Sequence, residues 1–257
     1  MHLLAAQPGG FTDDEGIIDL QQSPADIVIL SAADSSLTAL AASAEALPED
    51  FPDIRLANWV QLLKPAAFDL YQDKVLDHAK LVVVSLLGGK NYWPYGFSQL
   101  DAWVNASTAH KPRRLIVVPG DDIADPELFL LSNVAVEQAT QVWRYIREGG
   151  PVNLQHLYAY LADQFLDKPY DWQLPQRLPS CLLYMEKSRL SYPQASLADW
   201  QQRWCSQAND AAVCVILFYR SHLQSANTKM FDDLITCLNQ QGLNILPLAL
   251  TSLKEEE

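Results

Sequence analysis

The sequence LVVVSLLGGKNYWPYG at residues 81–96 decides the fold predicted for this chain. Its first half, Leu81–Leu87, is apolar and rich in β-branched residues, which is typical of a strand buried on both faces in a parallel sheet. Two glycines, Gly88 and Gly89, follow directly. Ligands of open α/β sheets bind beyond the carboxyl ends of the strands, and glycines there let a ligand approach the backbone closely. The segment therefore predicts a buried strand that leads into a candidate binding loop.

Three aromatic residues, Tyr92, Trp93 and Tyr95, lie just after these glycines. Flat rings at the end of a strand suit a flat ligand, and Pro94 fixes the turn beside Trp93. The alternative is that the rings cap the sheet and pack on the following helix, as most aromatic clusters do. We predict that Trp93 lines a ligand-accessible cleft, with core packing as the alternative.

Short β-rich runs alternate with helical patterns along the first half of the chain. This alternation predicts an α/β fold with a doubly wound parallel sheet, of the Rossmann or flavodoxin type, and helices on both faces. The predicted elements are strands at His2–Ala6, Asp26–Ser31, Ile54–Trp59, Leu81–Leu87 and Leu115–Pro119, and helices at Ser35–Leu47 and Pro65–Ala79.

A helical hairpin is predicted next. Asp125-Pro126 begins a helix, because aspartate is a favoured N-cap and proline a favoured first helical residue. Gly149-Gly150 then ends one amphipathic helix, and Pro151 opens another. The apolar stripes of both helices are interpreted as packing surfaces.

Three prolines within Lys168–Pro179 break the helical pattern, so this segment is the best candidate for an exposed linker. A second α/β lobe follows, and it is expected to be truncated because no closing helix follows its last strand. The predicted domains are the first lobe at 1–125, the hairpin packed on it at 126–167, the linker at 168–180 and the second lobe at 181–257. The second lobe's predicted elements are strands at Cys181–Tyr184, Ala211–Tyr219 and Leu243–Leu250, and helices at Ser196–Cys205 and Met230–Gln240.

The charge balance argues against nucleic acid as a partner. The chain of 257 residues has 31 acidic and 18 basic side chains, a net charge of −13, whereas phosphate binding needs a basic footprint. The amino terminus has no basic region typical of a signal peptide, and no stretch approaches the ~18 to 20 apolar residues of a membrane span. We expect a cytoplasmic protein without a membrane anchor.

The four cysteines, Cys181, Cys205, Cys214 and Cys237, have neither the spacing of a redox pair nor that of a zinc site. We expect them to be buried free thiols. No metal site is predicted.

No nucleotide-binding motif is present. Gly89-Lys90-Asn91 is the only Gly-Lys pair, but Val84 occupies the position of the first P-loop glycine, and Asn91 replaces the Ser or Thr that holds magnesium. No strand is followed by G-x-G-x-x-G either. Asp121-Asp122 follows a strand and could bind metal or accept a proton, although an aspartate turn next to glycine is the commoner structure.

A polar cluster in the second lobe is the other candidate site. Phe218–Thr228 places a cation, Arg220, a titratable ring, His222, and an amide, Asn227, between a buried strand and a helix. This combination is typical of an anion-binding loop, and Arg220 could hold a carboxylate bidentately. The alternative is a polar loop in which Thr228 caps the helix.

Several blocks, in the same order from end to end, resemble the amino-terminal region of the cobaltochelatase large subunit, a family related to the large porphyrin-binding subunit of magnesium chelatase. No single block is a catalytic signature. The blocks are Pro24–Ser31, Arg55–Trp59, Asp69–Lys80, Leu81–Gly96, Val118–Asp122, Trp143–Pro151, Phe218–Asp233 and Leu246–Lys254.

The resemblance implies ATP-dependent insertion of Co²⁺, the metal substrate, into hydrogenobyrinic acid a,c-diamide during aerobic cobalamin synthesis. ATP and Mg²⁺ are expected on two smaller AAA+-type partner subunits, which agrees with the missing P-loop. Because family chains are several times longer, this chain alone is not expected to insert cobalt, and its catalytic residues remain unassigned.

By correspondence with the family's blocks, two walls of a macrocycle cleft are predicted. The alternative is a non-catalytic α/β module that binds a small ligand or docks a partner. The candidate tetrapyrrole-binding residues are Gly88, Gly89, Tyr92, Trp93 and Tyr95 on an aromatic wall, and Arg220, His222 and Asn227 on a polar wall.

Overall fold

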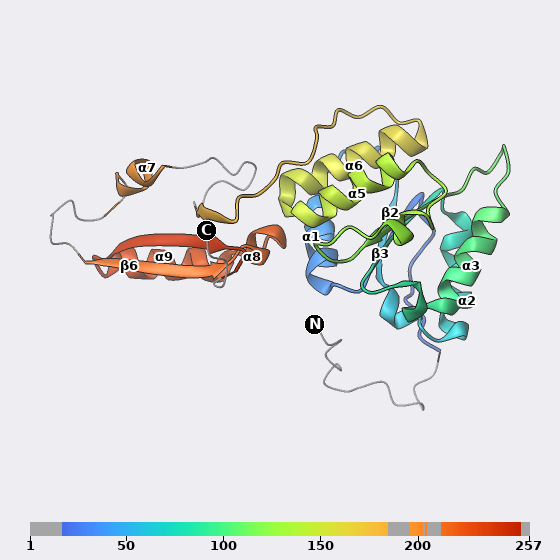
Figure 1. Cartoon of the computed structure of the whole chain (residues 1–257), viewed down its shortest axis with the longest axis horizontal. Helices are drawn as coiled ribbons and strands as arrows, with labels where there is room; N and C mark the ends of the chain where they lie inside the picture. The colour runs from blue at the N-terminus through green and yellow to red at the C-terminus, as the bar shows by residue number, and fades with distance from the viewer. Residues whose placement is uncertain (1–16, 185–195, 203, 205–211, 253–257) are drawn as a thin grey trace. The chain divides into compact units, whose positions relative to one another are not determined.

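The structure is a computed structural model that describes the chain except residues 1–16, 185–195, 203, 205–211 and 253–257. The predicted strand His2–Ala6 lies outside the described residues. The chain forms two compact units, each with a sheet of its own (Figure 1). The first unit comprises Met1–Ala32, Pro52–Gly120 and Asp125–Val134, and the second comprises Ala33–Phe51, Asp121–Ala124 and Ala135–Glu257.

The sheet of the first unit has four parallel strands in the order β2-β1-β3-β4. The chain runs from β1 outward to β2 and then returns past β1 to β3. With right-handed connections, this reversal makes the sheet doubly wound, as predicted. Each strand begins and ends within one residue of its predicted bounds: β1 (Ile27–Ser31), β2 (Ile54–Asn58), β3 (Leu81–Leu86) and β4 (Arg114–Pro119).

The two central strands are buried along their whole length. Every residue of β1 and of β3 is buried, whereas four of the five residues of the edge strand β2 are partly exposed. A strand with two buried faces has no position for a polar side chain that faces water. This explains why β3 is a continuous apolar run broken only by Ser85, and not an alternating pattern.

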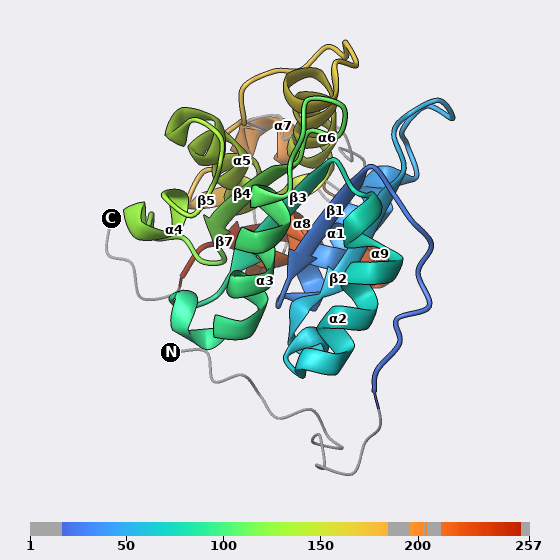
Figure 2. The ribbon, with the colours of Figure 1, turned by 90° about the vertical axis from the view of Figure 1, so that its right-hand side faces the viewer.

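Two helices, α2 and α3, lie side by side over one face of this sheet (Figure 2). Proline occupies the first turn of each, where its missing N–H costs no hydrogen bond. Asp125 caps α4 as predicted, since its carboxylate accepts the backbone N–H groups of Glu127 and Leu128. The bounds are η1 (Trp59–Leu62), α2 (Pro65–Lys74), η2 (Leu76–His78), η3 (Lys90–Tyr92), α3 (Pro94–Asn105) and α4 (Pro126–Phe129).

The helix predicted at Pro65–Ala79 is shorter than expected. It ends at Lys74, because Val75 leaves the helical conformation with φ −126° and a 3₁₀ turn follows. Val75 and Ala79 nevertheless remain buried, so the predicted apolar face is correct although the helix is not continuous.

Trp93 lies in the core of the first unit, and the prediction that it lines an accessible cleft is wrong. Only 1% of the residue is exposed. Its ring stacks on Trp59 with centroids 5.4 Å apart, and its Nε1 donates to the carbonyl of Leu62 over 3.2 Å. Gly96 makes room for the indole, since a Cβ there would lie 2.1 Å from the ring. The 3₁₀ turn η3 directs Trp93 inward, where its large apolar area is removed from water.

The second unit combines a helical hairpin with a smaller mixed sheet. Its strand order is β5-β7-β6, with β7 parallel to β6 and antiparallel to β5. The bounds are α1 (Asp34–Ala44), α5 (Val136–Glu148), α6 (Gly150–Leu166), β5 (Cys181–Leu183), α7 (Leu197–Gln201), β6 (Val213–Tyr219), α8 (Ser221–Gln224), α9 (Lys229–Gln240) and β7 (Asn244–Leu250).

Gly149 forms the corner between α5 and α6, as the sequence predicts. Its φ of +60° with ψ −163° is a conformation that is essentially restricted to glycine. A Cβ at this corner would lie 3.0 Å from the Cβ of Gln224 in α8, and Gln224 Nε2 donates to the carbonyl of Arg147 over 2.8 Å. The small residue thus lets α8 pack directly on the hairpin corner.

The second sheet is covered by α9 on one face, where Phe231 and Ile235 pack against Phe218. The other face of β6 carries an apolar stripe at every second residue, each between 43% and 52% exposed: Val213, Val215, Leu217 and Tyr219. Strand residues alternate between faces, so the stripe is one complete side of β6.

The proline-rich segment contains no helix or strand, as its prolines predict, but it is attached to the hairpin. Buried Asn153 of α6 exchanges hydrogen bonds with Gln176: the backbone N–H donates to Oδ1 over 2.8 Å, and Nδ2 donates to the carbonyl over 3.0 Å. The backbone N–H of Leu178 donates to Glu148. The predicted linker is therefore a strap along α5 and α6.

The cysteines differ from the expectation of burial. Cys181 and Cys237 are exposed, and Cys214 is partly buried; all three are free thiols. Cys205 lies outside the described residues.

Truncation of Trp93 should destabilise the fold. We expect Trp93→Ala to lower the free energy of unfolding by about 3 to 5 kcal/mol, because a buried indole leaves a cavity and loses its stacking partner. Tyr92→Ala is the matched control: this ring is 61% exposed, and its loss should cost under about 0.5 kcal/mol. Urea unfolding followed by circular dichroism measures both. Equal stability of the two variants would contradict the core position of Trp93.

Removal of the Asn153 amide should release the strap. Asn153→Ala removes the side-chain partner of the buried Gly149 carbonyl and of the partly buried Gln176 backbone, so we expect a loss of about 1 to 3 kcal/mol and faster cleavage within Lys168–Pro179 by a broad-specificity protease. Asn105→Ala, at an exposed asparagine bonded to Asp101, is the control and should leave both quantities unchanged. Cleavage at the parent rate in Asn153→Ala would show that the strap is held by other contacts.

Candidate functional site

The neighbouring strands β1 and β3 form the switch point of the first sheet. The chain leaves β1 toward β2 and leaves β3 toward β4, on opposite sides. Ligands of doubly wound sheets bind in the crevice outside the carboxyl ends of such a pair. Gly88 and Gly89 follow β3 at this edge, so the structure places the predicted glycines where the fold favours a ligand.

Gly88 and Tyr92 form one surface element at this edge. Gly88 has φ +85°, and a Cβ there would lie 2.7 Å from the Tyr92 ring, so only glycine lets the ring lie against the turn. Tyr92 is nevertheless 61% exposed. No atom in the described part of the chain lies within 4 Å of a Cβ built on Gly89. The edge therefore presents one accessible aromatic ring beside open backbone.

Tyr95 lies on the α2 side and has a fixed orientation. Its hydroxyl donates to Asp69 Oδ1 over 2.6 Å, and its half-buried ring packs edge-on against Phe68. This hydrogen bond to a carboxylate, together with burial, raises the pKa of Tyr95 above its usual value, since ionisation would place two negative charges side by side. Trp93 is in the core, so the aromatic wall consists of Tyr92 at the edge and Tyr95 beside it.

The second candidate loop begins with Arg220 at the end of β6. The Nη1 group donates to the carbonyls of Leu178 over 2.7 Å and Pro179 over 3.2 Å. Arg220 lines a polar cavity of about 230 Å³ within the second unit. It thus fixes the end of the strap and faces a cavity at the same time.

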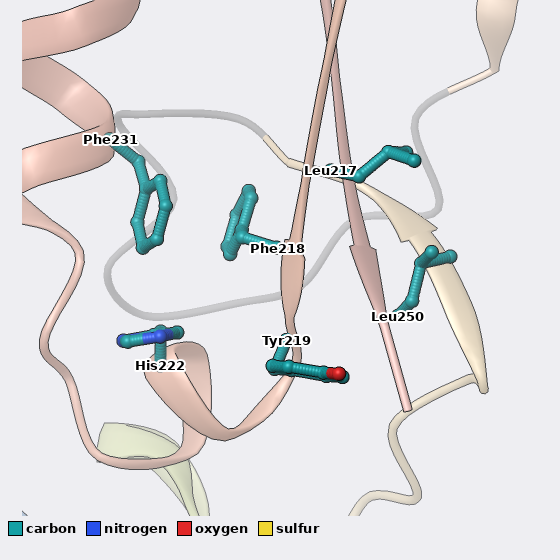
Figure 3. Close-up of a pocket in the computed structure, with 6 residues that line it drawn as sticks. All are labelled: Leu217, Phe218, Tyr219, His222, Phe231 and Leu250. Carbon is teal, nitrogen blue, oxygen red and sulfur yellow. The ribbon is translucent and has the colours of Figure 1, made fainter. Parts of the chain in front are cut away.

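His222, two residues later, lines a different cavity of about 250 Å³ with the end of β6. Its ring lies edge-on to Phe231, with centroids 5.0 Å apart, and Phe231 stacks on Phe218 at 4.0 Å. Figure 3 shows these three rings on the α9 side of the strand, with Leu217 and Leu250 on the other side. The surroundings of His222 are therefore aromatic and apolar.

Asn227 is exposed and lies at the end of the loop before α9. Its backbone N–H donates to the carbonyl of His222 over 2.8 Å, which closes the loop. The polar wall predicted from Arg220, His222 and Asn227 is thus divided: the first two line separate cavities, and the third faces solvent.

Two cationic residues, Arg147 and Arg177, join Arg220 around the polar cavity and were missed by the sequence analysis. Arg147 lies in the block Trp143–Pro151 that carries part of the family resemblance, and Arg177 lies in the proline-rich strap. Arg147 lies about 70 residues and Arg177 about 40 residues before Arg220, so no local sequence pattern could group the three.

The part of the chain that the structure describes contains no group of three or more His, Cys, Asp or Glu side chains arranged to hold a metal ion. None of its helices has the length and apolar character needed to cross a membrane. Asp121 forms the turn that the sequence favours, since its carboxylate accepts the N–H of Ile123 over 3.0 Å.

Known proteins are similar to almost the whole chain. The aerobic cobaltochelatase subunit CobN of Pseudomonas aeruginosa is 47% identical over 255 residues, and the protein of that name from Sinorhizobium sp is 34% identical over 263 residues. Each match includes 99% of this chain and 20% of the relative, so the chain spans about one fifth of the length of these proteins.

A solved structure and a family profile agree with these relatives. The catalytic subunit of cobaltochelatase from Mycobacterium tuberculosis superposes with a TM-score of 0.63 and 26% identity, covering 90% of this chain and 16% of the larger one. The profile of the CobN/Magnesium Chelatase family matches residues 143–257, which include the strap, the second sheet and most of the hairpin. Residues 143–257 therefore match the CobN/Magnesium Chelatase family, and nearly the whole chain is similar to about one fifth of the proteins named aerobic cobaltochelatase subunit CobN.

Proposed function

We propose that this chain is the amino-terminal, tetrapyrrole-binding part of the large subunit of an ATP-dependent cobaltochelatase. The reaction is the insertion of Co²⁺ into hydrogenobyrinic acid a,c-diamide in aerobic cobalamin synthesis, in the cytoplasm. One observation carries this proposal: two proteins named as aerobic cobaltochelatase subunits match 99% of the chain. In this proposal the chain contributes binding and does not insert the metal alone.

The edge of the first sheet supports a role in macrocycle binding. A tetrapyrrole is a large flat ring, and the exposed face of Tyr92 beside Gly88 and Gly89 offers a flat surface with open backbone next to it. An aromatic ring stacked on a π-system adds about 0.5 to 1.5 kcal/mol beyond the area buried. Tyr95, whose hydroxyl is bonded to Asp69, is proposed as the second aromatic residue of this wall.

The second unit supports a role in recognising the polar edge of the macrocycle. The peripheral carboxylates of a corrin precursor are anions, and Arg220 is the cation of the predicted polar wall. His222 and Asn227 are proposed as separate contacts, because His222 lines a different cavity from Arg220 and Asn227 is exposed. The ring of His222 lies against Phe218 and Phe231, so it has aromatic neighbours on the α9 side of β6.

The division of labour follows from what the sequence lacks. The proposed reaction couples ATP hydrolysis to metal insertion, and the 257-residue sequence contains no P-loop or dinucleotide fingerprint. We therefore assign ATP and Mg²⁺ to two smaller AAA+-type partner subunits. The base that removes the inner N–H protons of the macrocycle is not assigned to this chain.

Tyr92 provides the direct test of tetrapyrrole binding. Titration of the chain with hydrogenobyrinic acid a,c-diamide should shift the absorbance spectrum of the macrocycle. Tyr92→Ala should weaken binding about three- to tenfold, as expected from the loss of one stacking contact, whereas Tyr92→Phe should retain the parent affinity. Absence of any spectral shift with the parent chain would overturn the proposed function.

The exposed stripe on β6 favours docking as a second candidate function. Contiguous apolar surfaces on soluble proteins commonly mark interaction sites. Because the curated relatives are about five times as long as this chain, we propose as occupant another region of the full-length polypeptide. In this alternative the second unit serves as a scaffold and performs no chemistry.

Leu217→Lys distinguishes this alternative. In the isolated chain Leu217 is 52% exposed, so the lysine should leave the melting temperature unchanged. In a full-length polypeptide that carries this segment, the same change should lower the melting temperature, because a charge would be buried against the docked region. Met230→Lys, at a 64% exposed residue of α9, should be neutral in both proteins. A neutral Leu217→Lys in the full-length protein would exclude docking on the stripe.

A further inference from the structure

The polar cavity of the second unit is formed by parts of the chain that are far apart in sequence. Arg147 comes from the end of α5, Arg177 from the strap and Arg220 from the end of β6. Ser180 and Thr251 line it as well, so the walls carry hydroxyl groups in addition to guanidinium groups. The chain as a whole is acidic, with a net charge of −13, whereas three arginines lie together around this cavity.

The charges around the cavity leave a net positive environment. Glu148 already has partners: Arg147 Nε donates to its Oε1 over 3.2 Å, and the backbone N–H of Leu178 donates to its Oε2 over 3.2 Å. Arg147 is further held over the ring of Trp143 at 4.8 Å. Arg147 and Glu148 neutralise each other as a pair. The other charged side chains that line the cavity are two cations, Arg177 and Arg220, and one carboxylate, Asp122.

Arg220 presents an edge that fits a carboxylate. Its Nη1 group is used for the carbonyls of Leu178 and Pro179, whereas Nε is buried and donates to no acceptor. Nη2 likewise makes no hydrogen bond with any residue the structure describes. Nε and Nη2 form the fork of a guanidinium that binds the two oxygens of a carboxylate side by side. A buried N–H without an acceptor is costly, so a ligand that supplies the acceptor gains affinity.

Arg177 is a second cation at the cavity. It is exposed, and it donates to no acceptor in the described part of the chain. Its charge is thus available to an anion in the cavity, and its removal breaks no protein contact seen in the structure.

The size and charge of the cavity select the ligand. About 230 Å³ is smaller than the roughly 300–1,000 Å³ of pockets that hold drug-sized molecules, so a whole macrocycle does not fit. A carboxylate on a short arm does fit. Asp122 on the cavity wall disfavours a dianion such as phosphate more than a singly charged carboxylate.

We infer that Arg220 and Arg177 form a binding site for a carboxylate on a flexible side arm, with Arg220 as the bidentate contact. This inference rests on the proposed function where it identifies the ligand: a peripheral carboxylate of the corrin precursor. The carboxylate site itself is independent of the macrocycle and is testable with a small acid.

The probe is the monomethyl ester of glutarate, because at neutral pH it carries one carboxylate on a short arm, a single negative charge and no ring. Calorimetric titration of the 257-residue chain at constant ionic strength should detect its binding, and inorganic phosphate should bind more weakly. Arg220→Lys keeps the charge but loses the fork, and should weaken monomethyl glutarate binding about tenfold, the loss expected for a charge-assisted hydrogen bond. Arg177→Gln should weaken it less.

Arg144→Gln is the matched control, since Arg144 is an exposed arginine of α5 that does not line the cavity. It should leave monomethyl glutarate binding unchanged. Circular dichroism and thermal unfolding of each variant confirm that the fold is retained, and Arg177→Gln supplies an independent reading if Arg220→Lys unfolds. Unchanged monomethyl glutarate binding in both cavity variants, or tighter binding of phosphate, overturns the inference.

Hydrogenobyrinic acid a,c-diamide separates this inference from the proposed function. Monomethyl glutarate binding that depends on Arg220, without tetrapyrrole binding, supports the carboxylate site and overturns the proposed function. Tetrapyrrole binding that is unaffected by Arg220→Lys and Arg177→Gln overturns the carboxylate site as a macrocycle contact and leaves the proposed function standing.

Discussion

The burial of β3 on both faces is the constraint on which the first unit depends. All six residues of β3 are buried, and it pairs with β1 on one side and β4 on the other. A parallel strand needs a connection that crosses the sheet, and in the first unit the helices α2 and α3 cover one face of the sheet. The edge of the sheet where the candidate glycines lie is therefore fixed by the same packing that stabilises the core.

The core also decides which aromatic residues reach solvent. Trp93 and Tyr92 are neighbours in sequence, yet one is 1% and the other 61% exposed. Stacking on Trp59 and the space left by Gly96 stabilise the buried indole. The 3₁₀ turn before it then leaves Tyr92 on the surface against Gly88. Of Tyr92, Trp93 and Tyr95, Tyr92 is thus the most exposed, Tyr95 is half-buried and Trp93 is in the core.

The second unit depends on polar contacts as much as on apolar ones. Asn153 and Glu148 hold the strap, Arg220 binds its last carbonyls, and Gly149 admits α8 to the hairpin corner. Buried polar groups of this kind are costly unless each has a partner, and the partners come from remote segments. The same contacts bring three arginines together around one cavity, so the architecture of the strap and the chemistry of the candidate carboxylate site have a common origin.

The sequence by itself determined the four described strands of the first sheet and the resemblance to the cobaltochelatase family. Apolar β-branched runs such as Leu81–Leu87 identify buried strands because no polar residue is tolerated on either face, and Asp125-Pro126 identifies a helix start by local hydrogen bonding. Only the tertiary structure decided that Trp93 is core, that the proline-rich segment is held as a strap, and that Arg147, Arg177 and Arg220 share a cavity. The physical reason is range: secondary structure follows from neighbouring residues, whereas exposure and convergence depend on contacts between residues tens of positions apart.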